Sequence, residues 1–217
     1  METALHNILE RVRAAAADAT PLRLCGGGSK DFHGLALEGT PLVTARAGTP
    51  LQELQATLAQ AGQALAFEPP HFALGDKQPT VGGMVAAGWS GPARASSGAV
   101  RDFVLGVEII NGRGELLRYG GQVMKNVAGY DVSRLMAGSW GTLGVITEVS
   151  LKVLPVAPAQ ATLVFAMDEA QALEALNRWG GQPLPLNASC WAQGQLWLRL
   201  CGAQAAVLQQ AALVLLG

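Results

Sequence analysis

The chain has 217 residues, of which 50% are hydrophobic and 14% are charged, and its formal net charge is −1 at pH 7. This length suits one large or two small globular domains with a sizeable core. Without a basic excess the chain has little attraction for nucleic acid or anionic lipid, and its 27 glycines cluster without the period of collagen.

Signals for targeting and metal binding are missing from the sequence. The N-terminus has no basic segment followed by an apolar run, so we expect no signal peptide. No stretch approaches the roughly 18 apolar residues of a membrane span. Cys25, Cys190 and Cys201 are widely spaced, and neither Cys-x-x-Cys nor His-x-His occurs. These patterns predict a reduced, cytoplasmic protein without a metal site.

The first elements follow from apolar periodicity and from helix caps. Residues 4–18 repeat apolar side chains at helical spacing and predict an amphipathic helix. Short strands are predicted at 22–25 and 41–45. Thr49-Pro50-Leu51-Gln52 resembles a capping box with Pro in the first turn, opening a helix that stops at Gly62.

A second cap is predicted at Thr80, at the start of a Gly/Ala-rich helix. The elements predicted after it are, in chain order, a hairpin of strands 103–110 and 115–119 around Asn111-Gly112-Arg113-Gly114, a short helix from Asp131 to Gly138 and a strand over 145–154.

The chain changes character between Pro155 and Pro158, since residues 159–217 are almost without charge. A low-charge unit of this kind is either an incomplete domain, a domain whose apolar face meets a partner, or a small self-contained layer packed on the first domain. Its predicted order is strand, helix, strand, strand and helix, one strand short of a ferredoxin-like unit. These elements are expected at 161–167, 168–179, 187–192, 195–200 and 203–216.

Glycine clusters are the strongest chemical signal. Gly26-Gly27-Gly28-Ser29 follows a strand, and successive glycines let backbone N–H groups converge on an anion such as a diphosphate. A flexible surface turn explains the same residues equally well. Two known phosphate loops are excluded, because Ser29 rather than Gly precedes Lys30 and because Asp31 stands where the Rossmann pattern needs Gly.

Two further clusters occupy 79–91 and 138–147. The first combines a helix N-terminus with small residues, which suits a phosphate or a flat ring but equally suits tight helix–sheet packing. The second is a Gly turn leading into a strand, whose backbone could reach a heterocycle. Three such clusters together favour a long ligand held largely by main chain.

In this order, the clusters resemble the flavoprotein family of vanillyl-alcohol oxidase and p-cresol methylhydroxylase. The matching segments are LCGGGS at 24–29, PTVGG at 79–83, SGAVRDFVLGV at 97–107 and GSWGTLGVIT at 138–147. The resemblance implies an α+β fold: a two-subdomain FAD-binding domain over 1–156, then a partial ferredoxin-like cap domain over 157–217.

The resemblance also implies the contacts to FAD. The first segment would hold the pyrophosphate, the second would line the path from phosphate to ribityl, the third would lie near the flavin or its chain, and the fourth would touch the adenine or flavin edge. The implied cofactor-binding residues are Gly26, Gly27, Gly28, Ser29, Thr80, Gly82, Gly83, Ser97, Gly98, Asp102, Gly141, Thr142 and Ile146.

KNVAGYD at 125–131 is similar to the branch of glycolate oxidase and D-lactate dehydrogenase. The GGGSKDF sequence at 26–32, and Trp at position 140 of the GSWGTLGVIT segment, resemble the corresponding sequences of the smaller flavin-binding subunits of glycolate oxidase. This implies an α-hydroxy acid substrate such as glycolate. It also implies a larger catalytic flavoprotein subunit and an iron–sulfur subunit as partners, in a cytoplasmic complex peripheral to the inner face of the cell membrane.

Two departures from the family bear on these expectations. Many relatives attach FAD covalently through a His at or beside the pyrophosphate loop, whereas this chain has Ser29 there and His33 four residues on, so we expect noncovalent FAD. Family chains normally continue beyond the point that corresponds to residue 217, so the chain is expected to be truncated or a short member.

No catalytic residue is assigned. Oxidation of an α-hydroxy acid needs an Arg for the carboxylate and usually a His base, and the only histidines are His6, His33 and His71, outside the predicted cap. Three functions stay open: an FAD-binding redox subunit that passes electrons within a complex, a self-sufficient D-lactate or α-hydroxy-acid dehydrogenase, and a non-catalytic assembly subunit that has lost the flavin.

Overall fold

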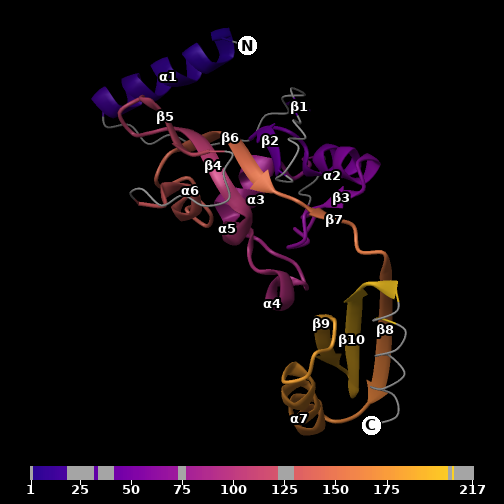
Figure 1. Ribbon diagram of the computed structural model, residues 1–217. Coiled ribbons are helices and arrows are strands. Elements are labelled where there is room, and N and C mark those ends of the chain that lie inside the picture. Colours follow the sequence, from indigo (N-terminus) through magenta and orange to yellow (C-terminus); the bar gives the residue numbers. More distant parts are fainter. Residues whose placement is uncertain are drawn as a thin grey trace.

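The computed structural model describes residues 2–18, 32–33, 42–72, 77–121, 130–204 and 207. Figure 1 shows a larger N-terminal part and a smaller C-terminal unit. The elements are α1 (Glu2–Ala17), β1 (Phe32–His33), β2 (Leu42–Arg46), α2 (Leu51–Gln60), β3 (Gln63–Ala64), α3 (Val81–Ala87), α4 (Arg94–Ser97), α5 (Val100–Phe103), β4 (Val104–Ile110), β5 (Leu116–Gly120), α6 (Val132–Leu135), β6 (Val145–Lys152), β7 (Leu154–Pro155), β8 (Ala159–Ala166), α7 (Glu169–Gly180), β9 (Leu186–Ala192) and β10 (Gln195–Gly202).

The larger part is built on an antiparallel sheet of five strands in the order β1-β2-β6-β4-β5. Side chains of α2, α3 and α5 join those of the sheet in one hydrophobic core. Leu51 and Phe67 are fully buried there, and each such side chain contributes roughly 2 kcal/mol through burial. The α+β class, the helix at the N-terminus and the hairpin of β4 and β5 are confirmed.

A β-bulge in β6 decides which of its side chains face the core. Ile109 of β4 pairs with Ile146, but Glu108 pairs with Glu148, so Thr147 is the extra residue. The bulge allows Ile146 and Val149 both to be buried, which strict alternation along the strand would forbid. The sequence predicted a regular strand here and gave no sign of the bulge.

Two predicted helix caps are confirmed and one is wrong. Thr80 Oγ1 accepts a hydrogen bond from Gly83 N–H at 3.2 Å, and Asp131 Oδ1 accepts one from Arg134 N–H at 3.1 Å. At α2 the N-cap is Pro50, without a side-chain cap bond.

The predicted capping box does not form because the backbone at residues 49–51 is hydrogen-bonded to residues 79–81 at the start of α3. Thr49 C=O accepts from Val81 N–H at 2.9 Å, and Leu51 N–H donates to Pro79 C=O at 2.8 Å. These bonds satisfy the start of α2 from outside the helix and leave the Thr49 side chain fully buried.

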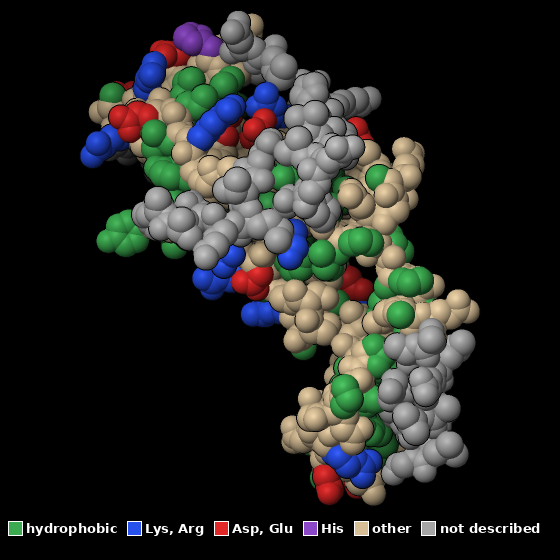
Figure 2. All heavy atoms as spheres, viewed as in Figure 1, with side chains coloured by type: hydrophobic (Ala, Val, Ile, Leu, Met, Phe, Trp, Pro, Cys, Tyr) green, Lys and Arg blue, Asp and Glu red, His purple; other side chains and the backbone are tan. Residues whose placement is uncertain are grey.

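The C-terminal unit has its own antiparallel sheet, in the order β8-β10-β9, and its own hydrophobic core. Leu196, Leu198 and Leu200 point from β10 to α7, where Trp179 is buried. Side chains of the opposite rows, such as Trp197, are more exposed. The predicted order of strand, helix, strand and strand is confirmed. On the face drawn in Figure 2, charged side chains gather on the larger part and are sparse on this unit.

Polar contacts join the two parts. Arg199 Nη2 of β10 donates to both carboxylate oxygens of Glu68, at 2.7 and 2.6 Å. Ser96 Oγ of α4 donates to Asn187 C=O of β9 at 2.7 Å. The C-terminal unit is thereby attached next to the segment that leads into residues 97–102.

Some predicted features lie outside the described residues. These are the strand at 22–25, the GGGS loop at 26–29 and residues 125–129 of the KNVAGYD segment. Of the helix predicted at 203–216, the structure describes Gln204 and Val207 as helical, and Val207 is buried in the second core.

Candidate functional site

The third and second glycine clusters lie side by side. Gly138 N–H donates to Val85 C=O at 3.0 Å, and Trp140 N–H donates to Ala86 C=O at 2.8 Å. The segment that begins at Gly138 therefore runs against the C-terminal half of α3, and two sequence motifs that are far apart in the chain form one surface.

The segment around residues 97–102 joins the same surface. Ser90, which follows α3, accepts through Oγ a hydrogen bond from Val100 N–H at 2.9 Å. Three of the four segments that resemble the flavoprotein family are thus brought together around α3. The first segment, at 24–29, lies wholly outside the residues that the structure describes.

At the start of α3, packing explains one glycine and leaves the other open to a ligand. Gly82 N–H donates to Ala47 C=O at 2.8 Å, and a Cβ on Gly82 would lie 2.4 Å from the Ala47 Cβ. Gly82 therefore allows the helix to meet the sheet. Gly83 is exposed, and its N–H is bound by Thr80 Oγ1. The expected contacts of Thr80, Gly82 and Gly83 with FAD stay predictions. Because the N–H groups of Gly82 and Gly83 are already hydrogen-bonded within the chain, a phosphate would need further donors from other residues.

The turn at residues 97–102 is shaped by its own hydrogen bonds. Gly98 has φ = 101° and ψ = 170°, a conformation that is essentially restricted to glycine. Asp102 Oδ2 accepts from Ala99 N–H at 2.9 Å. Ser97 is half-buried and Asp102 is exposed. These contacts fix the course of the backbone past α3, and a further contact of Ser97, Gly98 or Asp102 with FAD stays a prediction.

In the third cluster a glycine turn precedes the buried part of the strand. Gly141 has φ = 76°, and Thr142 Oγ1 donates to Ser139 C=O at 2.6 Å. The side chain of Ile146 belongs to the core and is 9% exposed. We expect Gly141 and Thr142 to contact the ligand through the backbone of their turn. Ile146 is expected to contact it through its main chain alone, because its side chain is buried.

Two buried hydroxyl groups test whether a polar ligand fits this surface. Thr49 Oγ1 and Ser139 Oγ are buried and have no hydrogen-bond partner among the described residues. Thr49 adjoins the start of α3 through its bond to Val81, and Ser139 adjoins its end. Buried hydroxyls are normally hydrogen-bonded, and Ser139, which is half-buried beside the end of α3, is the one of the two that a polar ligand such as FAD could approach.

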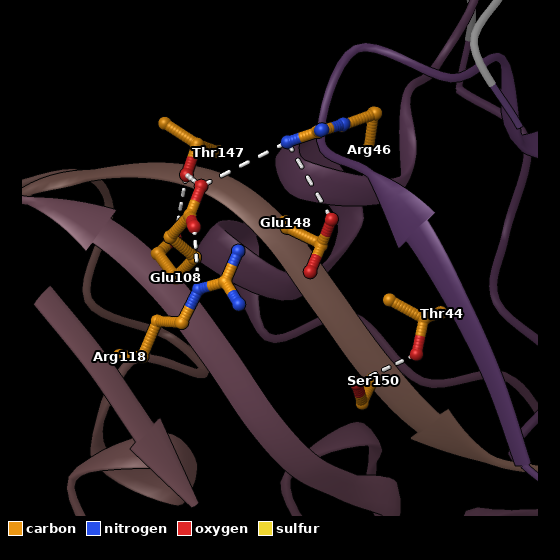
Figure 3. A network of polar contacts seen from close by, with 7 residues as sticks. All are labelled: Thr44, Arg46, Glu108, Arg118, Thr147, Glu148 and Ser150. Carbon is orange, nitrogen blue, oxygen red and sulfur yellow. Dashed lines mark hydrogen bonds and ion pairs between the residues drawn. The ribbon is translucent and has the colours of Figure 1, made fainter. Parts of the chain in front are cut away.

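A separate polar network lies on the other side of the five-stranded sheet from the core (Figure 3). Glu108 is only 3% exposed, and its carboxylate accepts from Arg118 Nε at 2.7 Å and from Thr147 Oγ1 at 2.8 Å. Arg46 Nη1 lies between two carboxylates, 3.8 Å from Glu108 Oε1 and 3.5 Å from Glu148 Oε2.

The network keeps Glu108 ionised. Burial alone would raise the pKa of Glu108, but the hydrogen bonds from Thr147 and Arg118 and the charges of Arg118 and Arg46 outweigh it, and the pKa lies below its ordinary value. A carboxylate this well paired is suited to holding the bulged strands rather than to moving protons. The sequence did not single out Glu108, because its place in β4 gives no sign of burial on the outer face.

Other candidate sites are weak in the described part of the chain. No group of three or more His, Cys, Asp or Glu residues suited to a metal ion occurs among the described residues. His71 is exposed and hydrogen-bonds Gln55 through Nε2. A cavity of about 320 Å³ includes none of the described residues expected to bind FAD, and is lined by Gln55, Ala59, Gln63, Ala64, Leu65, Glu68, Pro69 and Val156.

The described helices contain none with the length and apolar character needed to cross a membrane.

Comparison with known proteins gives a family context to this geometry. Residues 30–120 match the model of a family described as "FAD binding domain". The chain is 46% identical to "Glycolate oxidase subunit GlcE" of Escherichia coli (strain K12), over 97% of this chain and 63% of that protein. It is 40% identical to "Glycolate oxidase subunit GlcD" of Bacillus subtilis (strain 168), over 39% of this chain and 18% of that protein.

The fold is also found in a solved structure. An alkyldihydroxyacetonephosphate synthase superposes with a TM-score of 0.65 at 19% identity, over 83% of this chain and 39% of that chain. At this identity the likeness concerns the fold alone. The chain spans less than two thirds of the length of each of these relatives.

Proposed function

We propose that the chain is an FAD-binding redox subunit of an oxidase of glycolate or another α-hydroxy acid, because residues 30–120 match a family described as "FAD binding domain" and because the chain is similar over almost its whole length to a glycolate oxidase subunit. The observation that carries the proposal is the assembly of the second, third and fourth family segments around α3 by hydrogen bonds at Val85, Ala86 and Ser90. Bound FAD would supply the redox chemistry, and the chain would hold and orient it.

The cofactor is held without a covalent bond in this proposal. Ser29 occupies the place where a covalent relative has His, and it cannot form that linkage to the flavin. The 26–29 loop is assigned to the pyrophosphate, and the surface beside α3 to the rest of the cofactor. The unpartnered hydroxyl group of Ser139 supports a polar ligand there.

The C-terminal unit is proposed to be a partial cap domain of ferredoxin-like design, following an FAD-binding domain over 1–156. Strands β8 and β9 both run antiparallel to β10, which lies between them, so β8 and β9 are parallel to each other. Helix α7 connects them, which makes a split β-α-β arrangement.

The subunit is proposed to act within a complex, with a larger catalytic flavoprotein subunit and an iron–sulfur subunit, on the cytoplasmic face of the cell membrane. The chain's few histidines support a division of labour: His6 and His71 are exposed, and neither belongs to the C-terminal unit. The chain alone is therefore expected to bind FAD and to turn over no glycolate with an artificial electron acceptor.

Titration of the purified chain with FAD, followed by flavin fluorescence, tests this function. The Gly27→Val variant is expected to lose FAD binding, since the branched side chain would occupy the space of the phosphate. Gly112→Val is the matched control, because a Cβ at Gly112 meets nothing within 4 Å in the β4–β5 turn. Retained FAD binding in Gly27→Val would overturn the loop assignment, and turnover of glycolate by the chain alone would favour a self-sufficient dehydrogenase.

A further inference from the structure

Three aromatic side chains form a row on the surface at the end of α3, which we call the aromatic wall: Phe72, Trp89 and Trp140. The ring centroids of Phe72 and Trp89 are 4.7 Å apart, and those of Trp89 and Trp140 are 6.2 Å apart, both pairs being edge-to-face. The three residues are 61%, 36% and 68% exposed, respectively. The rings thus support one another while much of their surface stays in contact with water.

A close approach of two glycines builds the wall. Gly88 ends α3 with φ = 70°, and a Cβ on it would lie 3.0 Å from Gly138 Cα. This contact sets the residue after Gly88, which is Trp89, beside the turn that carries Trp140. The pairing of Trp89 with Trp140 therefore follows from the contact between the second and third glycine clusters, and Phe72 packs on Trp89 from outside them.

The backbone of Trp140 is in an unfavourable conformation. Its φ is 53°, in the left-handed region that bulky residues rarely occupy. Strain of this kind persists where the surroundings fix it, and it gathers at ligand-binding sites. Because Trp140 is mostly exposed, burial of its side chain does little to offset the backbone strain. A ligand that contacts the ring would supply the missing stabilisation.

We infer that the aromatic wall, with Trp140 at its end, packs against the flavin ring of FAD; this rests on the proposed function. Trp140 belongs to the segment 138–147 that is expected to contact the cofactor. Aromatic rings pair with planar rings by offset stacking or edge contact. Ser139, the adjacent residue, holds a buried hydroxyl without a partner among the described residues, which can serve the polar edge of the ring.

Fluorescence titrations of the full-length chain test the assignment with FAD and, separately, ADP. ADP shares the adenine and the pyrophosphate of FAD but lacks the flavin ring. The variants are Trp140→Leu, Trp89→Leu and the conservative Trp140→Tyr. Trp197→Leu is the matched control, because Trp197 is 44% exposed on β10 in the C-terminal unit.

Trp140→Leu is expected to weaken FAD binding about tenfold, as loss of an aromatic pair does, and to leave ADP binding unchanged. Flavin fluorescence, quenched by the wall in the wild type, should recover in part. Trp89→Leu should show the same effects to a smaller degree, Trp140→Tyr should restore both, and Trp197→Leu should change neither.

Three outcomes overturn the inference and leave the proposed function standing. Unchanged FAD affinity and flavin fluorescence in both Leu variants would remove the wall from the site while leaving FAD binding intact. An equal loss of ADP binding would assign the wall to the adenine instead. A wild-type chain that binds ADP and FAD equally well, without flavin quenching, would show that the flavin ring is bound elsewhere. Failure of the wild type to bind FAD at all would instead refute the proposed function, and the inference with it.

Discussion

The Glu108 network and the aromatic wall are two unusual groups of side chains on one domain, and they are unusual in opposite ways. Glu108 is a buried charge whose two carboxylate oxygens are both engaged by described residues. Trp140 is an exposed apolar side chain on a strained backbone. The carboxylate of Glu108 is fully hydrogen-bonded within the chain, whereas the Trp140 ring leaves apolar surface in contact with water.

Whether a side chain's interactions are satisfied within the chain distinguishes a structural role from a binding role here, and residue type alone would not. A buried, ionised glutamate would ordinarily attract attention as a catalytic acid or base. Its hydrogen bonds and its lowered pKa instead identify it as part of the sheet. The tryptophans would ordinarily be assigned to a core, yet their exposure and their place where two segments proposed to bind the cofactor meet favour a binding role.

The largest expected effect comes from breaking the network. Glu108→Ala should lower the free energy of unfolding by about 2 kcal/mol, since it removes a buried charge partner and leaves Thr147 Oγ1 without its carboxylate acceptor. Urea denaturation measures this. Glu148→Ala, at a half-buried position whose ion pair among the described residues is with Arg46, is the control and should cost less than about 1 kcal/mol. Equal losses in both variants would contradict a special role for Glu108.

The pH dependence of stability should report the same carboxylate. Because the folded-state pKa of Glu108 is lowered, its contribution is present above its unfolded pKa of about 4.3 and is lost as pH falls through the folded-state value. The stability difference between wild type and Glu108→Gln should therefore be constant near neutral pH and shrink below about pH 4. A difference that grows on acidification would contradict the assigned sign.

The junction between the two parts should give a smaller effect. Glu68→Gln weakens the ion pair with Arg199, in which both partners are partly exposed, and should cost about 1 kcal/mol or less. Limited proteolysis between β7 and β8 should become faster if the pair holds the C-terminal unit in place. Glu53→Gln, an exposed change on α2, is the control. Equal cleavage rates in both variants would show that the pair does not fix the unit.

The smallest effect on stability is expected at the wall itself. Trp140→Gly relieves the strain at φ = 53°, offset by the greater freedom of glycine in the unfolded chain, so the unfolding free energy should change by less than about 1 kcal/mol. Trp197→Gly, in the middle of β10, should be more destabilising because glycine weakens strands. Thermal melts measure both, and the reverse order would contradict the assignment of Trp140 to binding rather than to packing.

Much of the fold could be predicted from the sequence because its signals are local. The Thr80 and Asp131 caps are confirmed, since a short polar side chain before a helix satisfies a backbone N–H three residues on. Thr49 shows the same local signal and fails, since tertiary bonds at Leu51 and Val81 replace the cap.

The candidate site was predictable as a set of segments and not as an arrangement. The glycine motifs identified the segments around α3, but they did not distinguish Gly82, which packs on Ala47, from Gly83, which is exposed. Nor could they find the wall, because Phe72, Trp89 and Trp140 are far apart in the sequence and meet through tertiary contacts such as that of Gly88 with Gly138. Tertiary contacts of this kind leave no periodic trace in the sequence.

The central claim is that the chain holds FAD without a covalent bond, and an absorbance spectrum of the purified, FAD-loaded chain before and after acid precipitation tests it most directly. We predict flavin bands that pass into the supernatant on precipitation. Bands that stay in the pellet would contradict the reading of Ser29 and establish a covalent link. A chain that remains colourless after addition of FAD would contradict the proposed function and favour an assembly subunit that has lost its cofactor.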